Sequence, residues 1–272
     1  MTPIAVTTLV PPAIPTDLPP SPVMPTTARL GSPAPQSAPH RRERARMNHA
    51  VLETRLRTFG VVPVVTIRDA ADAPALGAAL AAGGLPVAEI TFRTDAAADA
   101  IAALRSTVPD VLVGAGTVLD VSTLRRAMTA GAQFAVAPGF NPVVIDAGRE
   151  LGIPVIPGVS SPTDIEAALA RDIRLVKFFP AEAAGGLAFL KAVAAPYRHV
   201  SFMPTGGITP TNLPDYLAEP FVVACGGSWI ATEKAIKDKR FDAIAAAAAT
   251  AAALVARVRC PSETSPSETR SA

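Results

Sequence analysis

Cysteine and histidine are scarce in this chain of 272 residues, which contains two of the first and three of the second. Cys225 lies in an apolar run and Cys260 in a polar stretch, so they offer neither a disulfide framework nor a CxxC metal pair. His40, His49 and His199 are scattered along the chain, and no histidine-based metal site is visible. Carboxylate-only metal sites remain open but have no motif here, and we expect neither a metal nor a cofactor. A reducing cytoplasm is the simplest compartment.

An excess of charge of one sign is also missing. The net charge is +2, and arginine and lysine are spread along the chain rather than gathered in a stripe, so the sequence does not predict nucleic-acid binding. Long uninterrupted apolar runs are missing too, because the Ala-rich stretch 241–258 is short and contains Thr250. We expect this stretch to be the last helix of the domain and not a membrane span.

Proline is concentrated at the start of the chain, where residues 1–46 hold 11 of the 28 prolines and end in the charged run RRERAR. Such a composition cannot build a packed core, so we expect an extended, disordered tail. Prolines interrupt its apolar residues and no charge precedes them, which argues against a secretory signal. The tail is either a targeting or interaction segment or the product of an upstream start codon, and we favour a protein that opens at Met47. The predicted domain is 47–258, followed by a polar tail at 259–272.

Short apolar runs rich in β-branched residues follow one another after the tail. They start at residues 61, 87, 112, 134, 154, 175, 201 and 222. Ala- and Leu-rich segments with helical spacing separate them, several opened by a capping residue or proline and closed by glycine. Strands that are apolar along their whole length are typical of a parallel sheet covered by helices, so these units predict a single-domain (β/α)8 TIM barrel. A doubly wound open sheet is the alternative, but the GxGxxG motif of its nucleotide-binding form is absent after the first strand.

One lysine stands inside a predicted strand. The chain has five lysines, and four lie in helix-like or charged stretches, whereas Lys177 is surrounded by apolar residues in LVKFFPAE. One interpretation is a side chain that reaches the barrel mouth or pairs with Glu89 for structural reasons. The other is a lysine that loses its proton in an apolar site and forms a Schiff base with a carbonyl, whose iminium withdraws electrons.

Glu89 and Arg93 lie on the predicted strand that starts at residue 87. A carboxylate between Ala88 and Ile90 is costly to bury unless it is paired or chemically active, so Glu89 is a candidate general acid and base. Residues 89 and 93 face the same side of a regular strand, and the arginine could hold a substrate carboxylate near the base. Arg93 could equally be a surface residue just past the end of the strand.

Two glycine pairs end the last two predicted strands. Exposed N–H groups at a Gly-rich turn and at a helix start bind phosphate, and barrels commonly use the loops after strands 7 and 8 for this purpose. Thr209 and Pro210, which follow the first pair, could cap and open a helix. Each pair alone could be a β-bulge or a tight turn, but together they predict a phosphate cup. Its members are Gly206, Gly207, Gly226, Gly227 and Ser228.

A series of motifs resembles one enzyme family. In order they are EITFRT, GAGTVL, PGF, IPGVSS, VKFFPAE, FMPTGGI and GGSW. As a set they resemble the bacterial 2-keto-3-deoxy-6-phosphogluconate (KDPG) aldolases, some of which are also 4-hydroxy-2-oxoglutarate aldolases. The resemblance covers roughly residues 56–258, and the Pro-rich tail has no counterpart in the family pattern.

The resemblance implies a role for each matching residue. Lys177 would be the Schiff-base lysine, Glu89 the proton shuttle, and Arg93 with Thr117 the holders of the pyruvate carboxylate. The other implied contacts are to the substrate from Pro138, Phe179 and Thr205, and to its phosphate from Gly206, Gly207, Gly227 and Ser228. The reaction would be cleavage of a phosphorylated keto acid, KDPG, to pyruvate and glyceraldehyde 3-phosphate in the Entner–Doudoroff pathway. The family is trimeric and needs no metal.

Other functions fit parts of the same pattern. An aldolase that prefers the phosphogalactonate epimer or unphosphorylated 4-hydroxy-2-oxoglutarate would use the same lysine. A phosphosugar isomerase or epimerase would share the phosphate cup and use Glu89 and Lys177 without a covalent step. A catalytically silent barrel that senses sugar phosphates would not need the combination of Lys177, Glu89 and Arg93.

Overall fold

Every predicted apolar run contains at least one strand. The computed structural model describes residues 47–259, and the expected tails fall outside these residues except for Arg259, which ends the last helix. The strands are β1 (Val61–Val65), β2 (Val87–Thr91), β3 (Leu112–Gly116), β4 (Phe134–Val136), β5 (Val155–Ile156), β6 (Gly158–Val159), β7 (Leu175–Phe178), β8 (Ser201–Phe202) and β9 (Cys225–Gly227). All of their registered pairs are parallel, as the continuous apolar runs predict.

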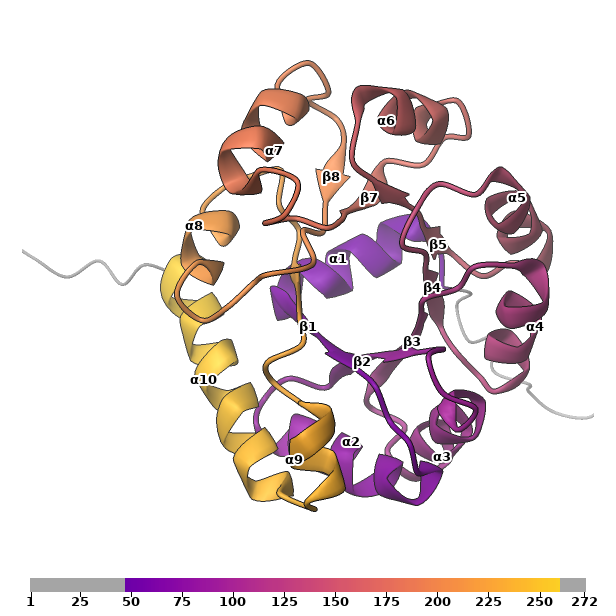
Figure 1. The fold of residues 1–272 in the computed structure, drawn as a ribbon, viewed down its shortest axis with the longest axis vertical. Helices are drawn as coiled ribbons and strands as arrows, with labels where there is room; N and C mark the ends of the chain where they lie inside the picture. The colour runs from indigo at the N-terminus through magenta and orange to yellow at the C-terminus, as the bar shows by residue number, and fades with distance from the viewer. Residues whose placement is uncertain (1–46, 260–272) are drawn as a thin grey trace, which may run out of the picture. The chain divides into compact units, whose positions relative to one another are not determined.

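The strands form two parallel sheets. A curled six-stranded sheet has the order β5-β4-β3-β2-β1-β9, and a three-stranded sheet has the order β6-β7-β8. Isolated parallel bridges join Phe202 to Val222 and Thr205 to Gly226, so the segment around β8 runs beside the segment that contains β9. Figure 1 shows these strands on the inside and most of the helices around them. Within the described residues the fold is therefore α/β with parallel strands.

The fifth apolar run is divided between the two sheets at Pro157. β5 pairs with β4, and β6 pairs with β7 immediately after the proline. Proline has no N–H to donate, so it interrupts the ladder, although its carbonyl still accepts a hydrogen bond from Lys177 N at 2.8 Å. The sequence predicted one strand here, and the proline makes it two short ones.

Helices follow most of the strands and cover them. They are α1 (His49–Phe59), α2 (Ala73–Ala82), α3 (Ala97–Thr107), α4 (Val121–Thr129), α5 (Pro142–Leu151), α6 (Pro162–Leu169), α7 (Gly186–Ala194), α8 (Leu213–Leu217), α9 (Glu233–Lys237) and α10 (Phe241–Arg259), with a 3₁₀ turn, η1 (Ala70–Asp72), before α2. Apolar residues from these helices and from the strands form one buried cluster.

Local capping chemistry explains where several helices begin and end. Asp120 caps α4 by accepting the N–H of Thr123, and this backbone hydrogen bond is the main cause of a lowered pKa at Asp120. α6 opens with a capping box between Ser161 and Asp164. Gly152 ends α5 with φ of 71°, a left-handed conformation that suits glycine at a helix end.

The Ala-rich stretch near the end of the chain forms the last helix, α10, as predicted. Its 19 residues and mean hydropathy of 1.6 would also suit a membrane span, so the expectation that it is too short was wrong. A stripe of buried residues at helical spacing packs it against the rest of the domain: Ile244, Ala248, Ala251 and Val255. The neighbours of α10 include α2, α8, α9 and β1.

Candidate active site

Very few polar side chains are buried in the described part of the chain. They belong to Asp72, Glu89, Thr91, Lys177 and Thr205. Asp72 pairs with Lys239, and the Thr91 hydroxyl donates to Val65 O at 3.0 Å, so both have structural partners. The remaining three are residues that the sequence identified as candidates for chemistry.

Lys177 and Glu89 meet inside the fold, although 88 positions separate them in the chain. Lys177 lies on β7 and Glu89 on β2, and Lys177 Nζ is 3.4 Å from Glu89 Oε1. Glu89 is fully buried and Lys177 is 5% exposed. Glu89 Oε2 has no hydrogen-bond partner among the described residues. The second carboxylate oxygen is therefore available to accept a proton.

Phe179 lies beside this pair, as the sequence resemblance implied. Lys177 Nζ is 5.1 Å from the centroid of its ring, a distance at which an aromatic face attracts a cation. Phe179 is half-buried, whereas Lys177 is buried. The half-buried ring therefore forms part of the surroundings of the buried amine.

Arg93 and Thr117 also come together, but not in the way that strand alternation suggested. β2 ends at Thr91, so Arg93 lies beyond the regular strand and is exposed. Its Nε donates to Thr117 Oγ1 at 3.3 Å, and no hydrogen bond joins it to Lys177 or Glu89 in the described structure. Thr117 follows β3 directly and has a left-handed φ of 58°. The two residues are neighbours because β2 and β3 end at the same level, with Thr91 opposite Gly116.

The remaining substrate candidates occupy two different strand ends. Thr205 is 6% exposed, its hydroxyl donates to Met203 O at 3.4 Å, and its backbone bridges to Gly226. Pro138 follows β4, and its carbonyl lies against Gly158, where an added Cβ would be 2.1 Å from Pro138 O. Sequence reasoning did not identify Gly158 or Gly116, which leave room for Pro138 and Glu89.

The predicted phosphate cup has exposed and buried members. Gly206 and Gly207 have φ of 100° and 81°, so both require the conformational freedom of glycine. Their N–H groups and that of Ser228 donate to no acceptor within residues 47–259. Gly207 and Ser228 are exposed, whereas Gly227 is buried within β9.

The helix expected after the first glycine pair begins later than predicted. Thr209 accepts a hydrogen bond from Asn212 N at 3.4 Å through its hydroxyl, and its carbonyl accepts the N–H of Leu213. Residues 210–212 form a turn, and α8 starts at Leu213 with only five residues. Pro210 therefore does not open the helix.

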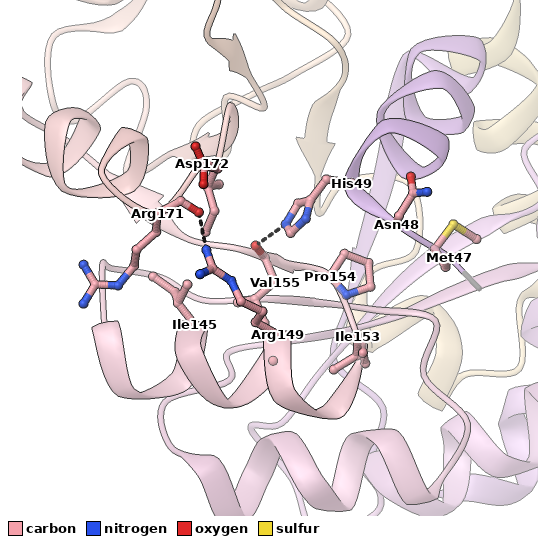
Figure 2. Close-up of a pocket in the computed structure, with 13 residues that line it drawn as sticks. Met47, Asn48, His49, Ile145, Arg149, Ile153, Pro154, Val155, Arg171 and Asp172 are labelled. Carbon is pink, nitrogen blue, oxygen red and sulfur yellow. Dashed lines mark hydrogen bonds between the residues drawn. The ribbon is translucent and has the colours of Figure 1, made fainter.

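A pocket of about 570 Å³ lies elsewhere in the fold, and Figure 2 shows its lining. Met47, Asn48 and His49 contribute from the start of the described chain, and His49 Nε2 hydrogen-bonds to Val155 O at 3.0 Å. None of the predicted site residues lines it. Val155 opens β5, so this pocket lies toward the amino ends of the strands, whereas barrels place chemistry at the carboxyl ends.

The fold and the pair define a class of protein: an α/β enzyme with a buried lysine and carboxylate in contact on parallel strands. The family model for KDPG and KHG aldolases, where KHG is 4-hydroxy-2-oxoglutarate, matches residues 52–247. The chain belongs to this family, and it is an aldehyde-lyase.

Relatives and solved structures agree with this assignment. The chain is 50% identical over 191 residues to the 2-dehydro-3-deoxy-phosphogluconate aldolase of Treponema pallidum, an alignment that covers 70% of this chain and 91% of the relative. It is 43% identical over 192 residues to the KHG/KDPG aldolase of Escherichia coli K12, covering 71% and 90%. The KDPG aldolase of Legionella pneumophila, solved with pyruvate as a covalent carbinolamine, superposes with a TM-score of 0.71 at 40% identity, covering 73% of this chain and 97% of that one.

Proposed function

We propose that the protein is a class I aldolase that cleaves 2-dehydro-3-deoxy-6-phosphogluconate to pyruvate and glyceraldehyde 3-phosphate, with Lys177 as the Schiff-base residue. The observation that carries this proposal is the buried contact of 3.4 Å between Lys177 Nζ and Glu89 Oε1. An amine must be neutral to attack a ketone, and the carboxylate is placed to receive its proton. The carbinolamine of pyruvate in the Legionella relative supports the same chemistry.

Cleavage of the keto acid would use Lys177 as the nucleophile and Glu89 as the acid and base. Glu89 takes a proton from the Lys177 ammonium, and the neutral amine attacks the C2 ketone to form a carbinolamine. Glu89 then gives a proton to the carbinolamine hydroxyl, which leaves as water, so that an iminium forms and Glu89 is a carboxylate again. Glu89 removes the proton of the C4 hydroxyl as the C3–C4 bond breaks, and the electron pair of that bond moves into the iminium. The aldehyde product leaves, and Glu89 returns the proton to C3 of the enamine. Water hydrolyses the new iminium, releasing pyruvate and the free lysine.

Arg93 and Thr117 would hold the carboxylate of the pyruvate portion. A guanidinium presents several N–H donors in a fork that matches a carboxylate, and Thr117 adds a hydroxyl donor. Their hydrogen bond at 3.3 Å keeps the two donors together beyond the ends of β2 and β3. Pro138 and Phe179 would contact the apolar faces of the substrate, and Thr205 its hydroxyl-bearing chain.

The phosphate would bind Gly206, Gly207, Gly227 and Ser228. The support comes from the three N–H groups in this set that no acceptor within residues 47–259 occupies, since backbone N–H groups at glycine turns are effective phosphate donors. Thr205 and this complete set favour the phosphogluconate substrate. The name of the Escherichia coli relative supports 4-hydroxy-2-oxoglutarate as a second substrate, cleaved to pyruvate and glyoxylate.

The two sheets would be arcs of one (β/α)8 barrel in a homotrimer of the cytoplasm that serves the Entner–Doudoroff pathway. The bridges between the β8 and β9 segments and the direct passage from β5 to β6 support closure. Closure would bring all strand ends of the proposed site to one face.

A coupled assay of pyruvate release tests the proposal. Purified protein is given KDPG, its phosphogalactonate epimer and 4-hydroxy-2-oxoglutarate side by side, and we expect the highest kcat/KM with KDPG. Borohydride added with pyruvate should inactivate the enzyme, because it reduces the imine irreversibly. Absence of pyruvate release would contradict an aldolase, and full resistance to borohydride would indicate an isomerase or epimerase without covalent chemistry.

A further inference from the structure

Glu182, the last residue of VKFFPAE, packs against the first glycine turn of the proposed phosphate cup. A Cβ built on Gly207 would lie 2.5 Å from both Cβ and Cγ of Glu182. Glu182 N also donates to Gly206 O at 3.0 Å. A residue with a negative charge is therefore in contact with the turn that would receive another negative charge.

The carboxylate of Glu182 has a buried partner in α8. Tyr216 is 1% exposed, and its hydroxyl donates to Glu182 Oε1 at 2.5 Å. Burial, followed by the hydrogen bond to Glu182, raises the pKa of Tyr216, so the hydroxyl keeps its proton and acts as a donor. The tyrosine ring is packed in the core, so the position of its hydroxyl is fixed relative to Glu182.

The segment that carries Tyr216 also contacts the turn directly, through the backbone carbonyl of Gly207. Asn212 Nδ2, just before α8, donates to Gly207 O at 3.1 Å. Tyr216 and Asn212 thus act on the same turn, one through Glu182 and the other through the backbone carbonyl of Gly207. Both contacts leave the N–H groups of Gly206 and Gly207 without an acceptor in residues 47–259.

A free carboxylate at position 182 would disturb this arrangement. Glu182 is exposed, so its flexible side chain has other rotamers available once the hydrogen bond is lost. A rotamer that brought the carboxylate over the turn would repel a phosphate there and compete with it for the same N–H donors.

We propose that Tyr216 is a positioning residue that restrains the Glu182 carboxylate and so sets the affinity of the glycine turn for phosphorylated substrates. The inference rests on the phosphate placement in the proposed function. It concerns binding at the phosphate end and leaves the chemistry at Lys177 unchanged. The Cβ and Cγ atoms of Glu182 pack against Gly207, while the hydrogen bond to Tyr216 keeps its carboxylate away from the N–H groups of the turn.

The test compares the wild-type enzyme with Tyr216→Phe, Glu182→Gln and the double variant. Binding of 3-phosphoglycerate is measured by isothermal titration calorimetry, separately from turnover of KDPG and 4-hydroxy-2-oxoglutarate. We expect Tyr216→Phe to weaken 3-phosphoglycerate binding and raise KM for KDPG by about tenfold, the scale of one nearby like charge. Its kinetics with 4-hydroxy-2-oxoglutarate, whose chain ends before the phosphate position, should change less than about twofold.

The double variant separates restraint from simple loss of structure. A neutral amide at position 182 repels no phosphate, so Glu182→Gln in the Tyr216→Phe background should restore binding to near the wild-type value. The inference would be overturned by unchanged binding in Tyr216→Phe, by equal losses with both substrates, or by a lack of rescue in the double variant. It would also be overturned if the wild-type enzyme did not bind 3-phosphoglycerate. A wild-type enzyme that binds it, shows the rescue and yet releases no pyruvate from KDPG would instead overturn the proposed function.

Discussion

Gly116 leaves the space that the Glu89 carboxylate occupies. A Cβ built on Gly116 would lie 2.3 Å from Oε1 and 2.7 Å from Cγ of Glu89, closer than atoms can approach. Gly116 ends β3 in register with Thr91 of β2, and Glu89 is two residues earlier on the same strand. The smallest residue on one strand therefore determines where the carboxylate on its neighbour can lie.

Replacing Gly116 with alanine should displace the Glu89 carboxylate. We expect kcat/KM to fall by about 100-fold, because a shift of roughly 1 Å in a catalytic group is that costly. Overpacking should also reduce the free energy of unfolding by about 1–3 kcal/mol. Steady-state kinetics and denaturant unfolding measure the two effects.

Gly139→Ala is the matched control for this variant. A Cβ at Gly139 would meet no atom within 4 Å, so kinetics and stability should stay near the wild-type values. If Gly116→Ala retained full turnover, the reaction would not depend on the present position of the Glu89 carboxylate.

Lys177→Arg should abolish both turnover and labelling. With pyruvate and borohydride, the wild-type protein should retain one reduced pyruvate per chain, and peptide mapping should find it in LVKFFPAE. A guanidinium keeps its charge at any working pH and cannot become the neutral nucleophile. Label on another of the five lysines would contradict the assignment.

Glu89→Gln should separate the proton transfer proposed for Glu89 from the nucleophilic attack proposed for Lys177. Most of the turnover should be lost, by about 100-fold or more, because general acid–base catalysis contributes on that scale. The lysine should still become labelled with pyruvate and borohydride, at a reduced rate. Equal turnover in Glu89→Gln and the wild type would assign the proton transfer to another group.

Ser228→Asp should discriminate between substrates. A carboxylate beside the proposed cup repels the phosphate dianion and leaves the pyruvate end untouched. KM for KDPG should rise by about tenfold or more, and KM for 4-hydroxy-2-oxoglutarate should change little. Parallel losses with both substrates would place the phosphate away from Ser228.

Removing residues 1–46 should leave folding and turnover essentially unchanged. The first described helix starts at His49 with its own cap from Asn48, and the family match starts at residue 52. We expect the same melting temperature and the same kcat/KM in the shortened protein. Precipitation or loss of most activity would show that the segment belongs to the folded enzyme.

The strands could be located from the sequence because parallel strands covered on both sides are apolar along their whole length. The same rule made Lys177 and Glu89 conspicuous, since each places a charge where packing alone would exclude one. Motif order then indicated the family. Local patterns could also place several helix ends, at Asp120, Ser161 and Gly152, because capping depends on residues close together in the chain.

Contacts between distant segments were decided only in three dimensions. Lys177 meets Glu89 across 88 positions because the strands curl toward one another, and no local pattern encodes that curvature. Arg93 bonds to Thr117 because β2 ends at Thr91, earlier than strand alternation required. The pairing of Glu182 with Tyr216 likewise depends on where α8 packs. A residue's neighbours along the chain limit its backbone conformation. Its chemistry depends instead on which side chains from other strands and helices the packing places within contact distance.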